Sequence, residues 1–312
     1  MMNKYQCRQV GSNTGFGDCT LDIDKVKGFF LVGQDFKIPA ASMASAAALM
    51  AFLLAASTAD SKEARIYPVH QLLDVTDNSE DDVTQTYGYG PSVTVRDGYY
   101  NWEFPFRKGG FCLLLALQQF NGDSKKVIFY DENWLLFGTA DGDDLAGIPL
   151  NEFYAPKWGV ATGSTKSNLR VKFSFAPVHI NKALAYVKFD AFNPELIKGL
   201  RNITLKLFSA AKPVYKVNLF TGCNSANLFE TFPTEFADDA LWIATNAATG
   251  AAITVTSVAA DANAKAYTVT LDSTDPDYPA VGTINLTLAA PSVLKAAGII
   301  GYEGLTLEIV NV

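Results

Sequence analysis

The sequence predicts a mainly β protein. A β-sandwich or barrel-forming domain with one or two helices precedes a small C-terminal immunoglobulin-like β-sandwich. Short runs that alternate apolar and polar residues recur along the chain, Gly, Pro, Asn and Asp separate them, and few stretches have helical length. With 312 residues, 49% of them hydrophobic and 18% charged, the chain is long enough to bury the cores of two domains.

The segment between residues 83 and 139 contains the densest strand signals. Val83 starts an alternation that resumes at Val93 after Gly90-Pro91, which predicts a hairpin over residues 83–96. Aromatic residues then occupy every second position of the next strand, so their rings share one face and need an apolar surface to cover them. These residues are Tyr100, Trp102, Phe104 and Phe106. A helix near 111–121 and a strand pair up to Thr139 complete this unit.

Further strands predict the rest of the two domains. Val26 to Val32 is a short apolar run of strand length, and Leu169 to Phe175 alternates most cleanly. After residue 235 aromatic residues become rare and Ala, Thr and Val dominate, which predicts an immunoglobulin-like domain over 235–312 in architecture only. We therefore expect an N-terminal arm at 1–20, a larger β domain at 21–234 and the small domain after it.

The stretch from Pro39 to Ala59 contains no charged residue. Its length is close to that of a membrane span, but most of its apolar residues are Ala, which contributes little to insertion. We predict a helix near 40–59 that is buried on most sides. A helix with so few polar residues favours burial on every face. We therefore expect a neighbouring subunit to cover the faces that its own domain leaves exposed.

Composition and cysteine spacing limit the possible partners. The formal net charge of −7 and the absence of a Lys/Arg cluster disfavour tight nucleic-acid binding. The first residues lack the apolar core of a secretory signal. The cysteines are far apart with no C-x-x-C pair, which favours free thiols in a reducing interior over a Cys7–Cys19 disulfide. They are Cys7, Cys19, Cys112 and Cys223.

No motif in the sequence points to catalysis. The two histidines, His70 and His179, stand outside any G-x-S-x-G or H-E-x-x-H pattern. The acidic segments at 74–82 and 141–144 lack the ligand spacing of a calcium loop and are expected to be solvated turns. We therefore predict no enzyme, no catalytic residue, no cofactor and no metal site.

The order of these elements resembles that of the tail tube proteins of tailed bacteriophages. The resemblance consists of the arm at 1–20, the hairpin at 83–96, the helix at 112–120 with strands on either side, and the small β domain after 235. It is a match of pattern over most of the chain and contains no diagnostic motif. The Ala-rich segment 39–59 departs from the simplest tube subunit.

The resemblance implies a structural protein of a virion, made in the host cytoplasm. Its subunits would form stacked rings, hexameric by family analogy, around a DNA channel, together with other virion proteins and without a membrane. Acidic side chains facing the channel would keep DNA mobile. The expected subunit-interface residues are Val83, Gln85, Tyr87, Tyr89, Val93, Val95, Tyr100 and Trp102.

Three alternatives stay open at the level of sequence. The first is another virion component, such as a head-decorating or head–tail joining protein. The second is a carbohydrate-binding or adhesive β protein, whose flat aromatic platform would include Tyr99, Tyr100, Trp102, Tyr154 and Trp158. The third is a secreted enzyme, which would need a pocket that joins His70 or His179 to carboxylates.

Overall fold

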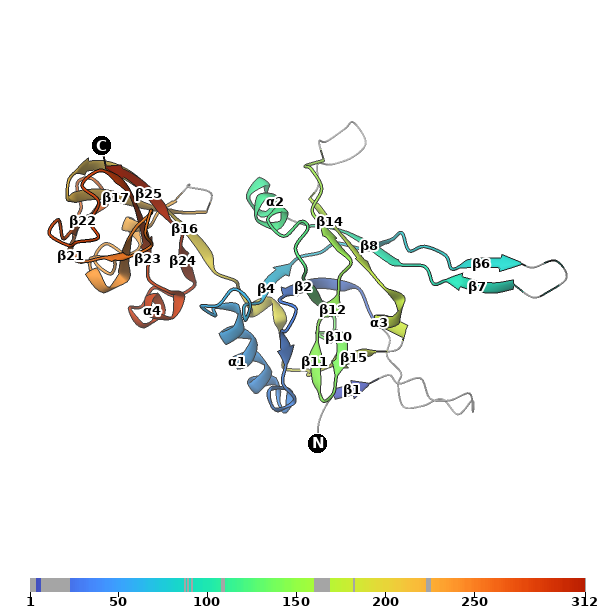
Figure 1. Cartoon of the computed structure of the whole chain (residues 1–312). Coiled ribbons are helices and arrows are strands. Elements are labelled where there is room, and N and C mark those ends of the chain that lie inside the picture. Colours follow the sequence, from blue (N-terminus) through green and yellow to red (C-terminus); the bar gives the residue numbers. More distant parts are fainter. Residues whose placement is uncertain are drawn as a thin grey trace, which may run out of the picture. The chain divides into compact units, whose positions relative to one another are not determined.

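The computed structural model in Figure 1 confirms the mainly β class. It describes residues 4–6, 23–86, 88, 90, 92–107, 110–159, 169–181, 183–222 and 226–311. The chain forms two compact units. Unit 1 contains Met1–Ser57 and Ser61–Lys198, and unit 2 contains Thr58–Asp60 and Gly199–Val312.

The larger sheet of unit 1 is antiparallel along its main path. Its strand order is β1 (Lys4–Gln6), β15 (Leu184–Val187), β10 (Leu136–Asp141), β9 (Lys126–Asp131), β2 (Val26–Val32) and β4 (Tyr67–His70). Three short strands attach to it, namely β3 (Lys37–Ile38), β11 (Asp144–Ala146) and β12 (Ile148–Pro149). We call it the central sheet.

β1 is the described part of the predicted arm; the rest of residues 1–20 lies outside the described residues.

A second, four-stranded sheet packs against one face of the central sheet. Its order is β13 (Glu152–Tyr154), β14 (Arg170–Phe175), β8 (Tyr100–Pro105) and β5 (Thr76–Asp77), and we call it the outer sheet. The two clearest alternations of the sequence pair here, since Phe104 lies opposite Val171 in the register of β8 and β14. Their apolar faces meet Phe29 of the central sheet, whose ring centroid is 4.9 Å from that of Phe173. The aromatic face of β8 is therefore covered within the chain.

The opposite face of the central sheet is covered by helix α1 (Ala46–Ser57) and the 3-10 turn η1 (Ala40–Met43) before it. Leu49 and Leu53 of α1 are fully buried against residues such as Phe30 of β2. Phe29 and Leu31 of β2 face the outer sheet, while Phe30 and Val32 face α1. This burial on both faces explains why β2 is apolar without interruption from Gly28 to Val32.

The remaining helices of unit 1 are short. α2 (Phe111–Gln118) falls in the segment predicted near 111–121 and buries Leu114 and Leu117 in the core between the sheets. α3 (Pro177–Asn181) and the 3-10 turn η2 (Pro194–Leu196) complete the unit. Within the described residues, no helix is both long and apolar enough to cross a membrane.

Unit 2 packs two sheets around its own core. One has the order β21 (Val255–Asp261), β22 (Ala266–Leu271), β17 (Val214–Thr221), β16 (Arg201–Ala211) and β24 (Tyr302–Gly304), with β18 (Ala226–Asn227) beside β17. The other has the order β20 (Ala252–Ile253), β19 (Trp242–Asn246), β23 (Gly282–Leu288) and β25 (Leu307–Asn311). The turns η3 (Leu228–Glu230) and η4 (Asp239–Leu241) and helix α4 (Pro291–Ala296) connect the strands. Buried residues from both sheets, including Tyr215, Tyr267 and Leu286, share one core.

The continuous part of unit 2 starts at Gly199, earlier than the boundary predicted at residue 235, and Thr58–Asp60 also belongs to this unit. β17 pairs with β22, and β16 pairs with the parallel strand β24 near the end of the chain. The composition changes near 235 because the later strands are rich in Ala and Thr, whereas the fold changes where strand partners change. The boundary between the units is set by which strands pair with each other. A short window of sequence does not contain this information.

The prediction of free thiols is wrong for Cys112, which is disulfide-bonded. Cys7, Cys19 and Cys223 lie outside the described residues, and so does the alternative Cys7–Cys19 pair. The free-thiol prediction depended on distance along the sequence. A disulfide requires only that two cysteines meet in the fold.

A tight contact inside the central sheet yields a testable prediction. A Cβ at Gly28 would overlap the Tyr130 hydroxyl and lie 2.5 Å from the Val69 carbonyl oxygen, so neither neighbouring strand leaves room for a methyl group. We expect Gly28→Ala to lower the free energy of unfolding of unit 1 by about 2–4 kcal/mol. Urea denaturation followed by tryptophan fluorescence measures this.

Gly110→Ala is the matched control, because a Cβ at Gly110 meets no atom within 4 Å. It is expected to change the unfolding free energy by less than about 1 kcal/mol. Equal losses in the two variants would contradict the steric account of Gly28.

Candidate functional site

The predicted hairpin forms and stands apart from both sheets of unit 1. Among the described strands, β6 (Val83–Thr86) and β7 (Ser92–Arg96) pair only with each other, with Gln85 opposite Val93 in the register. Figure 1 shows the pair extending away from the body of unit 1 as a two-stranded ribbon. Tyr87 and Tyr89, which follow β6 in the sequence, lie outside the described residues.

Every residue of the two hairpin strands is exposed. The exposed fractions of Val83, Val93 and Val95 are 47%, 52% and 61%, and none of these side chains belongs to a core of either unit. Exposed valines on a ribbon with two unpaired edges are unusual for a surface that meets only water. The hairpin therefore leaves apolar side chains accessible to water on both of its strands.

The base of the hairpin is held firmly. Asp82 accepts a hydrogen bond from the Gly98 backbone N–H at 2.9 Å, and Arg96 forms an ion pair with Glu80 at 3.1 Å. A Cβ at Gly98 would overlap the Glu80 carbonyl oxygen, so this close approach requires glycine. The acidic segment 74–82 thus binds the end of the hairpin to the edge of the outer sheet.

Tyr100 and Trp102, also predicted at the interface, lie on β8 beyond this base. Both are half-buried, and their rings point to the core between the sheets: Trp102 lies 4.8 Å from Phe175 and 5.6 Å from Phe129 between ring centroids. Tyr100 stacks on Phe175 at 5.5 Å. The structure therefore separates these two residues from the exposed valines and gives their rings a packing role within the chain.

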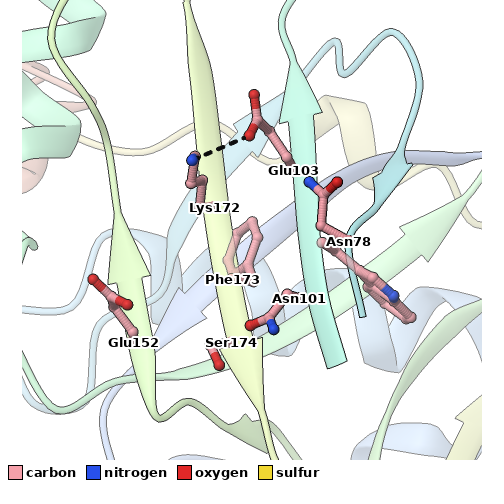
Figure 2. A pocket seen from close by; sticks show the side chains of 8 residues that line it. Asn78, Asn101, Glu103, Glu152, Lys172, Phe173 and Ser174 are labelled. Atoms are coloured by element: carbon pink, nitrogen blue, oxygen red, sulfur yellow. Dashed lines mark ion pairs between the residues drawn. The ribbon is translucent and has the colours of Figure 1, made fainter. Parts of the chain in front are cut away.

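The polar residues of the same strands form a groove on the outward face of the outer sheet. Its volume is about 280 Å³ and Figure 2 shows the side chains that line it. They are Asn78, Asn101, Glu103, Glu152, Lys172 and Ser174, with Trp102 and Phe173 beside them. The side chains alternate along each strand, so the same alternation that directs aromatic rings inward directs these polar groups outward.

Charges within this groove are largely paired. Glu103 accepts from Arg170 at 2.9 Å and forms a second ion pair with Lys172 at 3.4 Å, which Figure 2 marks. The Glu103 side chain is only 16% exposed, whereas Arg170 and Lys172 are about half exposed. Glu152 stands on the neighbouring strand β13, away from this cluster. The groove offers hydrogen-bonding groups without a strong net charge.

The aromatic platform expected of an adhesive protein is not assembled. Tyr100 and Trp102 pack inward, and Trp158 is partly buried against the same core. Tyr154 is 40% exposed, on β13. These residues therefore do not present one flat surface.

His70 is part of a buried hydrogen-bond chain. Its Nδ1 lies 2.6 Å from the Tyr130 hydroxyl and its Nε2 lies 2.7 Å from the Ile197 carbonyl oxygen, so both ring nitrogens are engaged. Burial lowers the pKa of His70, and burial likewise raises the pKa of Tyr130. This arrangement joins β4, β9 and the segment after η2.

His179, on α3, is half-buried, and its pKa is lowered first by burial and then by the nearby Lys126. In the part of the chain that the structure describes, neither histidine is hydrogen-bonded to a carboxylate. The His–carboxylate hydrogen bond of the enzyme alternative is therefore not formed by either histidine among the described residues.

The second acidic segment, at 141–144, has a structural partner. Lys37 forms ion pairs with Asp141 at 3.4 Å and Asp144 at 3.3 Å, which raises the pKa of Lys37. Asp144 also accepts from the Ala40 backbone N–H at 3.0 Å, next to the start of η1. Among the described residues, no group of three or more His, Cys, Asp or Glu side chains is arranged to hold a metal ion.

Comparison with known proteins adds no evidence about function, so the functional argument depends on the geometry described above. No protein-family model, no curated protein and no solved structure matches this chain. The tail-tube resemblance accordingly stays a prediction from the sequence.

The buried histidine yields a prediction about pH. Because burial lowers the pKa of His70, the folded state keeps it neutral while the unfolded state takes up a proton below its ordinary pKa of about 6.5. Its contribution to stability is therefore present above that value and is lost as the pH falls towards the folded-state pKa. We expect wild-type unit 1 to lose more unfolding free energy between pH 7.5 and pH 5.5 than His70→Gln loses.

The difference between the two proteins cannot exceed about 1.4 kcal/mol per pH unit for one proton. Urea denaturation of both proteins at the two pH values isolates the histidine from other titrating groups. Parallel losses in wild type and variant would show that His70 is not the group responsible.

Proposed function

We propose that this protein is a structural subunit that assembles with copies of itself in a phage virion, as a tail tube subunit that forms stacked rings around a DNA channel. The observation that supports the proposal most directly is the β6–β7 hairpin, whose valines are exposed on a ribbon anchored at its base. A neighbouring subunit would cover these valines and pair with the free strand edges. Assembly in this way buries the valine side chains and satisfies the backbone groups of the strand edges.

The energetics favour such an assembly. Covering one half-exposed valine contributes about 1 kcal/mol, and backbone pairing along a strand edge adds directional hydrogen bonds. In a closed ring every subunit gives one hairpin and receives another, so each gain is made once per subunit. The firm base lowers the ordering cost, because the hairpin is held before it binds.

The charge of the chain is compatible with a DNA channel. The formal net charge is −7, and like charge on a channel wall repels a polyanion and prevents it from sticking. Which side chains would line the channel depends on the ring geometry. A head-decorating or head–tail joining protein would use the same hairpin contact without enclosing DNA.

A second candidate function, carbohydrate binding by an adhesive protein, is favoured by the groove of Figure 2. Its amide, carboxylate and hydroxyl groups are the kinds of side chain that hydrogen-bond to sugar hydroxyls. The groove is accessible in a single subunit. Binding of the soluble monomer to a glycan array, abolished by Asn101→Ala, would favour this function over assembly.

The hairpin proposal is tested by assembly of hairpin variants. Replacing residues 83–96 by a short Gly-Ser linker, or introducing Val93→Asp with Val95→Asp, is expected to convert rings or tubes into monomers. Both changes remove apolar contact, and the second also buries charge. Light scattering after size-exclusion chromatography and negative-stain electron microscopy measure the outcome.

Val281→Asp is the control, because Val281 is 79% exposed but belongs to unit 2. It is expected to assemble like the wild type. A wild-type protein that stays monomeric at about 100 µM, or a hairpin deletion that still forms tubes, would contradict the proposal.

A further inference from the structure

A second pocket of unit 1 lies at the edge of the central sheet and has a different character from the groove of Figure 2. Its volume is about 420 Å³, within the usual range of small-molecule sites. It is lined by Lys25, Lys27, Gln71, Leu72, Leu73, Arg107, Trp134 and Glu195. These residues come from five separate stretches of the chain, and we call their site the basic pocket.

The charge of the basic pocket is opposite to that of the whole protein. Three cationic side chains line it, Lys25, Lys27 and Arg107, against one carboxylate, Glu195. Lys27 also forms an ion pair with Glu132 at 3.5 Å. Within the described ranges, neither Lys25 nor Arg107 forms an ion pair with a carboxylate. Lys25 and Arg107 thus line one concave site without an ion-pair partner of their own among the described residues, in a chain whose net charge is −7.

The backbone around the basic pocket adopts strained conformations. Gln71 has φ of 67° and Trp134 has φ of 62°, and only one other described non-glycine residue, Lys265, has a positive φ. A non-glycine residue in this region costs on the order of 1 kcal/mol and persists only where surrounding contacts impose it. Two such residues line the same pocket. This coincidence indicates a site whose shape is maintained against a local cost.

Specific contacts impose each of these conformations. On one side, the Arg107 N–H donates to the Gln71 carbonyl oxygen at 2.8 Å, and the Leu72 N–H donates to the Lys27 carbonyl oxygen at 3.0 Å. The segment after β4 is thus held between β2 and the end of β8.

On the other side, the buried carboxylate of Asp131 organises the turn that carries Trp134. It accepts from the backbone N–H groups of Asn133 at 2.8 Å and Leu135 at 2.9 Å, and from that of Asp24 at 3.3 Å. The Trp134 ring also lies 6.4 Å from that of Tyr130 between centroids. The backbone at Gln71 and Arg107 and the ring of Trp134 are therefore positioned before any ligand arrives.

We infer that the basic pocket binds a sugar that carries a phosphate or carboxylate group. Lys25 and Arg107 supply donors for the oxyanion, and the planar Arg107 guanidinium is suited to two oxygens at once. Trp134 supplies a flat apolar surface for the sugar ring, and Gln71 and Glu195 supply partners for its hydroxyls. A bare phosphate would leave most of the pocket filled with water. The inference is independent of the assembly proposed above.

The test is isothermal titration calorimetry of the full chain with glucose 6-phosphate, glucuronate, glucose and inorganic phosphate. We expect the two anionic sugars to bind with Kd of about 0.1–1 mM at low ionic strength, and more weakly as salt rises. Glucose and inorganic phosphate are each expected to bind at least tenfold more weakly. Lys25→Gln with Arg107→Gln should weaken glucose 6-phosphate binding at least tenfold.

Two further variants distinguish the inference from simpler explanations. Trp134→Asn removes the ring and introduces a residue that tolerates positive φ. It should weaken the binding of glucose 6-phosphate severalfold and leave the binding of inorganic phosphate unchanged. Lys172→Gln removes a cation of the other groove and should leave all four affinities unchanged. Far-UV circular dichroism checks that each variant is folded.

Several outcomes would overturn the inference. They are no heat of binding for either anionic sugar up to about 10 mM, equal binding of glucose and glucose 6-phosphate, equal binding of inorganic phosphate and glucose 6-phosphate, or an unchanged affinity in the folded double variant. Each can occur whether or not the hairpin variants assemble, so failure here is separate from failure of the assembly proposal.

Discussion

Burial of the central sheet on both faces is the constraint from which the rest of unit 1 follows. β2 sends Phe29 and Leu31 to the outer sheet and Phe30 and Val32 to α1, so neither side of the strand tolerates a polar side chain at these four positions. Two apolar layers require two covering elements, and the chain supplies them from distant segments. The Ala-rich helix thereby acquires a covered face within its own chain through Leu49 and Leu53.

Polar groups enter this apolar interior only where they are fully engaged. Asp131 is 1% exposed and accepts from three backbone N–H groups, which fix the turn between β9 and β10. Tyr130 fills the space above Gly28 and meets His70, which in turn meets the Ile197 carbonyl oxygen. An unpaired neutral group at these positions would cost about 1–3 kcal/mol, and an unpaired charge would cost more. The Asp131 contacts also place Trp134 at the basic pocket, so stability and site geometry share this residue.

Periodicity predicted the strands well and their partners poorly. The alternations at Tyr100 to Phe106 and at Leu169 to Phe175 identified two strands and their inward faces, and the hairpin over 83–96 forms as predicted. No local signal indicated that β8 and β14 are neighbours, and so the groove between Asn101 and Ser174 was missed. The basic pocket could not be predicted for the same reason. Nothing in the sequence shows that Lys25, just before β2, and Arg107, just after β8, line the same pocket in the fold. Positive φ at Trp134 has no signature in the sequence either.

The continuity between the hairpin and β8 has a mechanical consequence. β7 passes through three residues directly into β8, and β8 is bonded to β14 along a register that runs from Tyr100 opposite Phe175 to Pro105 opposite Arg170. A load on the hairpin along the strand direction would be carried in shear by all of those hydrogen bonds together, rather than by one bond at a time. The hairpin is thus anchored through β8 in the longest described strand pair of the outer sheet.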